Sequence, residues 1–151
     1  MNFNLFSLSR PFVFLFILLF VIFYPMLISI YVFLPLLIGA MSYILIQGIE
    51  KGNLGAILIA IMYMINLEVN LSLPLFFILI VTLLFYVGIY PFLTHFRKCR
   101  VCTPLLSVIL LDICYLGSLF AFDFIFQTQS IFLDSILLYS LIVDILIVVI
   151  L

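Results

Sequence analysis

The sequence predicts an all-α, polytopic integral membrane protein, a single bundle of about six transmembrane helices over residues 1–151. Hydrophobic residues make up 70% of the chain and charged residues 7%, whereas about a quarter of the residues in an average soluble domain are charged. The mean hydropathy is +1.61. A chain of this size has too few polar side chains to cover its apolar ones in water, so we expect lipid to cover them.

The basic residues indicate how the bundle is oriented. If the chain is cut into six spans, every lysine and arginine falls on the same side, and these residues are Arg10, Lys51, Arg97, Lys98 and Arg100. Basic residues near the ends of spans resist translocation and stay in the cytoplasm. We therefore expect this side and both termini to be cytoplasmic, with the five basic residues anchoring the chain against anionic lipid head groups.

The first two spans are expected from one uncharged run. Residues 11–47 would form a helix about 55 Å long at 1.5 Å per residue, nearly twice the thickness of a hydrocarbon core. Two spans at 12–27 and 31–47 fit better, separated by helix breakers at Pro25, Ser29 and Pro35. A single tilted helix would give five spans, but that count puts Arg10 and Lys51 on opposite sides of the membrane.

Two further spans are expected in the middle of the chain. A polar inner turn at 48–53 precedes a short third span at 54–66, and a fourth span follows at 73–93. Polar residues between these spans are costly in hydrocarbon and are expected in an outer loop: Asn66, Glu68, Asn70, Ser72 and Pro74. Glu68 is expected to be exposed there, as a possible contact for a cation or for a partner's basic side chain.

The last third of the chain predicts the remaining two spans. Residues 95–103 return the chain to the cytoplasm, and the fifth span follows at 104–124. The uncharged polar tract at 127–130 forms an outer loop before a sixth span at 131–151.

Two acidic residues fall inside the last two spans. Asp112 and Asp144 are both expected about 10 to 14 Å from the inner surface, at 1.5 Å per residue from Thr103 and Leu151. An acidic side chain at this depth costs about 2.5 to 3.5 kcal/mol unless it is protonated or paired. The two are therefore a possible intramembrane polar pair, either a proton or cation relay or two helix-packing carboxyls that share a hydrogen bond. The lack of an intramembrane basic residue favours packing.

No catalytic or metal centre is predicted. Cys99 and Cys102 form a Cys-x-x-Cys pair with His95 nearby, but the remaining cysteine, Cys114, is expected inside the fifth span, too far away to complete a zinc site. No nucleophile motif or phosphate-binding loop is present. We therefore expect no enzyme activity and no cofactor, and the net charge of -1 predicts no binding to nucleic acid.

Three segments resemble the MreD family of rod-shape-determining proteins, which are small bacterial inner-membrane proteins with about six spans and very short loops. The first segment, 32–37 with Tyr43, resembles the family's second span, which opens with a proline. The second, formed by Gly52, Gly55 and Ala56, resembles the start of its third span. The third, 110–113, resembles the centre of its fifth span, an aspartate between apolar residues. The resemblance covers residues 31–126. It departs in the third span, where Tyr63 stands in place of an acidic residue that the family often carries.

The resemblance implies a non-catalytic scaffold subunit of a bacterial cell-elongation complex for peptidoglycan synthesis, located in the inner membrane. The partners it implies are a MreC-like protein and, through it, cell-wall synthesis enzymes and the MreB cytoskeleton. Such a scaffold would recognise its partners through the lateral faces of its helices. The alternative is a small transporter or substrate-binding membrane subunit, in which Asp112, Asp144 and Glu68 would line the path.

Overall fold

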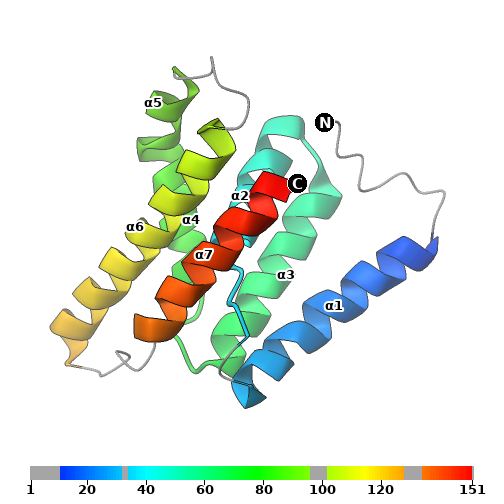
Figure 1. The fold of residues 1–151 in the computed structure, drawn as a ribbon, viewed down its shortest axis with the longest axis horizontal. Helices are drawn as coiled ribbons and strands as arrows, with labels where there is room; N and C mark the ends of the chain where they lie inside the picture. The colour runs from blue at the N-terminus through cyan, green and yellow to red at the C-terminus, as the bar shows by residue number, and fades with distance from the viewer. Residues whose placement is uncertain (1–10, 32–33, 96–101, 128–133, 151) are drawn as a thin grey trace.

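The described part of the chain is all-α. This computed structural model describes residues 11–31, 34–95, 102–127 and 134–150, and these ranges contain helices and no strand (Figure 1). The helices are α1 (Pro11–Ile30), α2 (Ile38–Lys51), α3 (Leu54–Asn70), α4 (Phe77–Gly88), α5 (Tyr90–Thr94), α6 (Cys102–Phe126) and α7 (Asp134–Ile150). The predicted fold class is therefore confirmed at the level of its secondary structure.

Two of these helices are long and apolar enough to cross a bilayer. They are residues 12–30 of α1 and the 25-residue helix α6, and most residues of both lie on the surface of the isolated chain. Helices α3 and α4 and residues 138–150 of α7 are shorter apolar helices. An apolar helix of about 20 residues matches the thickness of the hydrocarbon core. The length and apolar composition of α1 and α6 therefore support an association of the chain with a membrane.

Helix α2 occupies the centre of the bundle. It packs against α3, α4, α6 and α7, whereas α1 packs chiefly against α3 and lies obliquely at one edge (Figure 1). The largest fully buried side chains lie around α2, and they include Tyr63, Phe85, Leu45, Ile46 and Met64. Residues 36–42, at the start of α2, are all buried.

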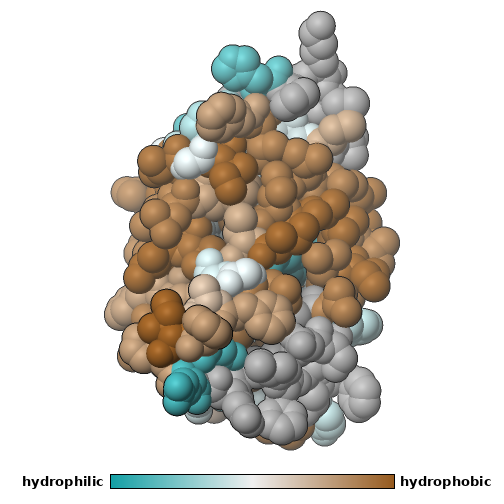
Figure 2. All heavy atoms as spheres, turned by 90° about the vertical axis from the view of Figure 1, so that its left-hand side faces the viewer, coloured by the Kyte–Doolittle hydropathy of each residue, from teal (hydrophilic) through white to brown (hydrophobic). Residues whose placement is uncertain are grey.

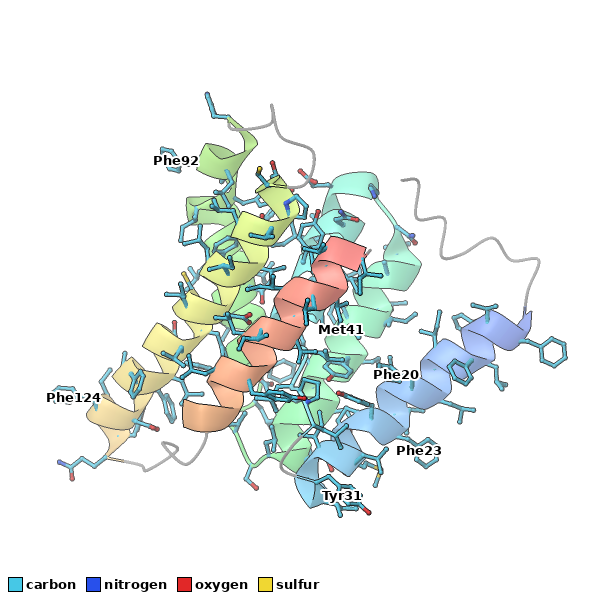
Figure 3. All side chains as sticks on the ribbon, in the orientation of Figure 1. Phe20, Phe23, Tyr31, Met41, Phe92 and Phe124 are labelled. Atoms are coloured by element: carbon cyan, nitrogen blue, oxygen red, sulfur yellow. The ribbon has the colours of Figure 1, made fainter. Side chains whose placement is uncertain are left out.

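The outer surface of the bundle is apolar. Figure 2 shows one face as a broad hydrophobic band, with hydrophilic residues gathered near its upper and lower ends. In Figure 3, Phe23, Phe92 and Phe124 point away from the bundle, with exposed fractions of 55%, 73% and 88%. Met41 lies inside it. A single-chain protein in water rarely exposes so much contiguous apolar surface.

The second helix begins at Ile38, later than the expected span at 31–47 suggested. Pro35 has no N–H to donate, and it disfavours a helical conformation at the residue before it, Leu34. Residues 34–37 are not helical, and Leu37, with a φ of 54°, has a left-handed backbone conformation directly before the helix. Leu36 and Leu37 are buried, and Leu34 and Pro35 are half-buried. The chain enters the bundle core in an irregular conformation and becomes helical only there.

The first helix continues through Pro25 to Ile30, so the expectation that Pro25 helps to end it is wrong. A proline inside a helix leaves the carbonyl four residues earlier, here that of Val21, without its N–H donor. Asn66 of α3 supplies the missing donor, because its Nδ2 lies 3.1 Å from the Val21 carbonyl oxygen and 2.9 Å from that of Ile22. The placement of Asn66 in a loop is thus also wrong, since a polar side chain in α3 has a partner on α1.

Replacing Asn66 with alanine should loosen α1 from α3 by about 1 kcal/mol, the net value of a typical hydrogen bond. The loss should shrink when Pro25 is also replaced with alanine, because an alanine at that position returns an N–H to the Val21 carbonyl. Chemical unfolding of the four proteins in a double-mutant cycle measures this coupling. Equal losses in both backgrounds would show that Asn66 does not act through the proline.

The third and fourth helices also differ from the expected segments. Helix α3 continues to Asn70, and α4 begins at Phe77, so the connection lies later in the chain than the one expected between the spans at 54–66 and 73–93. The segment expected at 73–93 is divided into α4 and α5, with Pro91 in the first turn of α5. A proline is favoured in a first helical turn and is costly further inside a helix, where it removes a backbone hydrogen bond. This preference is consistent with a new helix that begins just before Pro91.

Candidate functional site

The irregular segment before α2 has its backbone groups bonded by side chains from three other helices. The Tyr24 hydroxyl donates to the Pro35 carbonyl at 2.9 Å, and the Tyr63 hydroxyl donates to the Leu36 carbonyl at 2.8 Å. The Leu36 N–H donates to Ser140 Oγ at 3.0 Å. Non-helical backbone inside an apolar bundle requires such partners, because no water is there to provide them.

Asp144 caps the start of α2. The Gly39 N–H donates to Asp144 Oδ2 at 2.9 Å, and the Asp144 side chain is completely buried. Ser140 and Asp144 are four residues apart on α7, so they lie on the same face of that helix and both reach the start of α2. The first N–H groups of a helix lack internal partners and carry partial positive charge, which a carboxylate stabilises.

Asp112 approaches the same glycine from α6. A Cβ atom built on Gly39 would lie 2.7 Å from Asp112 Oδ1 and 2.8 Å from Asp112 Oδ2, closer than any side chain tolerates. The carboxyl therefore occupies the space that a side chain at position 39 would need. Asp112 and Asp144, expected as a possible pair, flank one residue and interact electrostatically. Among the described residues, Asp112 Oδ2 and Asp144 Oδ1 are buried and have no hydrogen-bond partner.

Glu68 is a second buried helix cap. The Phe76 N–H donates to Glu68 Oε2 at 2.6 Å, and the Ile78 N–H donates to Glu68 Oε1 at 2.7 Å, at the start of α4. Only 1% of the residue is exposed. The expectation that Glu68 lies exposed in an outer loop is therefore wrong, because the N–H groups of α4 hold its carboxylate inside the bundle. Its burial also removes it as a surface contact for a partner.

The remaining predicted residues lie apart from this site. Lys51 is exposed at the end of α2, where its Nζ lies 3.1 Å from Gln47 Oε1. Arg10, Arg97, Lys98 and Arg100 lie outside the described residues, so their anchoring role stays a prediction.

The histidine and cysteine residues considered above for a zinc site do not lie together in the described part of the structure. Cys99 lies outside the described residues, His95 and Cys102 are exposed, and Cys114 is partly buried in α6. Within the part of the chain that the structure describes, no three histidine, cysteine or acidic side chains form a group that would hold a metal ion.

Sequence reasoning missed the residues that build the start of α2. Gly39, Ser140 and Tyr63 each take part in the site, and none of them was expected to. Two signals were present: Pro35 lies inside an apolar run shortly before a glycine, and Ser140 precedes Asp144 by four residues. Together these patterns are typical of a helix that begins inside a bundle beside a polar helix face.

No protein-family model, curated protein or solved structure matches this chain. The resemblance to the MreD family therefore stays a prediction.

Proposed function

We propose that the chain is a multi-pass protein of the bacterial inner membrane and works as a non-catalytic scaffold subunit of a cell-elongation complex. The identity of the complex comes from the resemblance to the MreD family. The observation that supports a scaffold is the position of α1, which packs chiefly against α3 and leaves its other faces uncovered. The exposed fractions of Phe12, Phe16 and Phe23 are 84%, 73% and 55%. Aromatic side chains provide large contact areas of defined shape and are enriched at interfaces between proteins.

The buried carboxylates support a scaffold in a second way. Asp144 accepts a hydrogen bond from the start of α2, and Glu68 accepts two from the start of α4. Both acidic side chains thus hold helices in place. A structural role accounts for their presence in the bundle without a substrate that passes them.

The proposal is tested by co-purification from native membranes. Wild-type protein should bring down a MreC-like protein and cell-wall synthesis enzymes, identified by mass spectrometry. Replacing Phe16 and Phe23 with alanine should reduce their recovery about tenfold or more, since hot-spot residues contribute about 2 kcal/mol or more to an interface.

Phe92→Ala is the matched control. It removes an equally exposed aromatic ring from α5, on another helix, and should leave recovery unchanged. A wild-type eluate without any cell-wall synthesis protein would contradict the scaffold proposal.

A small transporter is the second candidate, because α2 starts inside the bundle beside Asp112 and Asp144. Helices that begin at the middle of a membrane bundle form ion and substrate sites in many transporters. Uptake into proteoliposomes that Asp112→Asn abolishes, with partner recovery unchanged, would favour this function over a scaffold.

A further inference from the structure

The two carboxyls beside Gly39 each present a buried oxygen that the surrounding side chains leave without a hydrogen bond. Asp144 is 0% exposed and uses Oδ2 to accept the Gly39 N–H, which leaves Oδ1. Asp112, whose carboxyl group also lies beside Gly39, leaves Oδ2. A buried carboxylate oxygen without a donor is costly, so this arrangement calls for a hydrogen between the two side chains.

No positively charged side chain is available to supply it. The sequence contains no lysine, arginine or histidine in residues 11–50, 52–94 or 101–151, which include α1, α3, α4, α6 and α7. The titratable groups that face Asp144 from α1 and α3 are Tyr24 and Tyr63. Their hydroxyls already donate to the carbonyls of Pro35 and Leu36. On the side of α2, the two carboxyls face the backbone N–H groups at the start of the helix, which carry a partial positive charge.

We propose that Asp112 and Asp144 form a proton-binding site that holds one proton between their two carboxyl groups. Asp112 is neutral and donates its O–H, while Asp144 is the carboxylate that accepts this hydrogen bond and caps α2. One proton then satisfies both carboxyls, and it removes the repulsion that two adjacent carboxylates would have. The site is independent of the scaffold function and would exist in a scaffold or in a carrier.

A proton fits this site better than a metal cation does. Metal cations such as Ca²⁺ and Mg²⁺ take about six or more oxygen ligands, whereas no group of three candidate side chains occurs among the described residues. A hydrogen bond needs only the two oxygens that are present.

Infrared spectroscopy of the purified full-length chain in lipid nanodiscs tests the proposal. The carbonyl stretch of a protonated carboxylic acid should be present at neutral pH and disappear at alkaline pH. One component of this band should be lost both in Asp112→Asn and in Asp144→Asn. Asp123→Asn, which removes another buried carboxyl from α6, should keep that component. If neither Asp112→Asn nor Asp144→Asn changes the band, the proposal is wrong.

Thermal unfolding gives a second, independent measurement. Wild-type protein should unfold at a lower temperature in alkaline than in neutral buffer, because loss of the proton leaves two adjacent negative charges. Asp112→Asn should fold and lose most of this pH effect, since its amide donates a hydrogen bond at any pH. Stabilisation of the wild type by sodium chloride but not by choline chloride, absent in Asp112→Asn, would instead identify a sodium site and overturn the proposal.

Discussion

Replacing Gly39 with alanine is expected to destabilise the chain by about 1 to 3 kcal/mol, the usual cost of overpacking a well-packed core. The new methyl group would lie less than 3.0 Å from all three carboxyl atoms of Asp112. The short side chain of Asp112 must then move away from the start of α2, and this movement should also disrupt the hydrogen bond to Asp144 that we propose. Unfolding of the purified protein in mixed micelles measures the loss.

Gly117→Ala in α6 is the matched control, because a Cβ atom there meets nothing within 4 Å. Alanine is the better helix former, so this variant should be neutral or more stable by up to about 1 kcal/mol. The penalty of Gly39→Ala should also vanish in an Asp112→Ala background, where the colliding atoms are absent. A penalty that persists there would place the collision elsewhere.

Replacing Glu68 with alanine is the second change with a large expected effect. It removes the acceptor of two N–H groups at the start of α4, those of Phe76 and Ile78. A buried donor left without a partner costs about 1 to 3 kcal/mol, so the total loss should be roughly 2 to 6 kcal/mol. Glu68→Gln keeps one acceptor oxygen and should lose about half as much.

Val69→Ala serves as the control for position 68. Val69 is the next residue of α3, with an exposed fraction of 60%, and its truncation should change the free energy of unfolding by less than about 0.5 kcal/mol. If Glu68→Ala unfolds at the same denaturant concentration as Val69→Ala, the two hydrogen bonds contribute nothing to stability.

The expectations for Asn66 and Glu68 are wrong for one shared reason. The sequence predicts a loop for both residues because an isolated polar side chain is costly in an apolar environment. That reasoning holds for a residue without a partner. Asn66 instead donates to the Val21 carbonyl, which Pro25 leaves without a donor, and Glu68 accepts hydrogen bonds from two N–H groups at the start of α4. Partners far apart in the chain cancel the cost, and periodicity along one helix does not reveal them.

The sequence alone determined that the described chain is helical, and that α1 and α6 are apolar enough to cross a bilayer. These properties follow from composition and from the length of uncharged runs, which are local. Only the tertiary structure decided where α2 begins and that Asp112 and Asp144 meet at Gly39. The reason is that hydrogen bonds between distant segments set the stability of an irregular backbone inside a bundle.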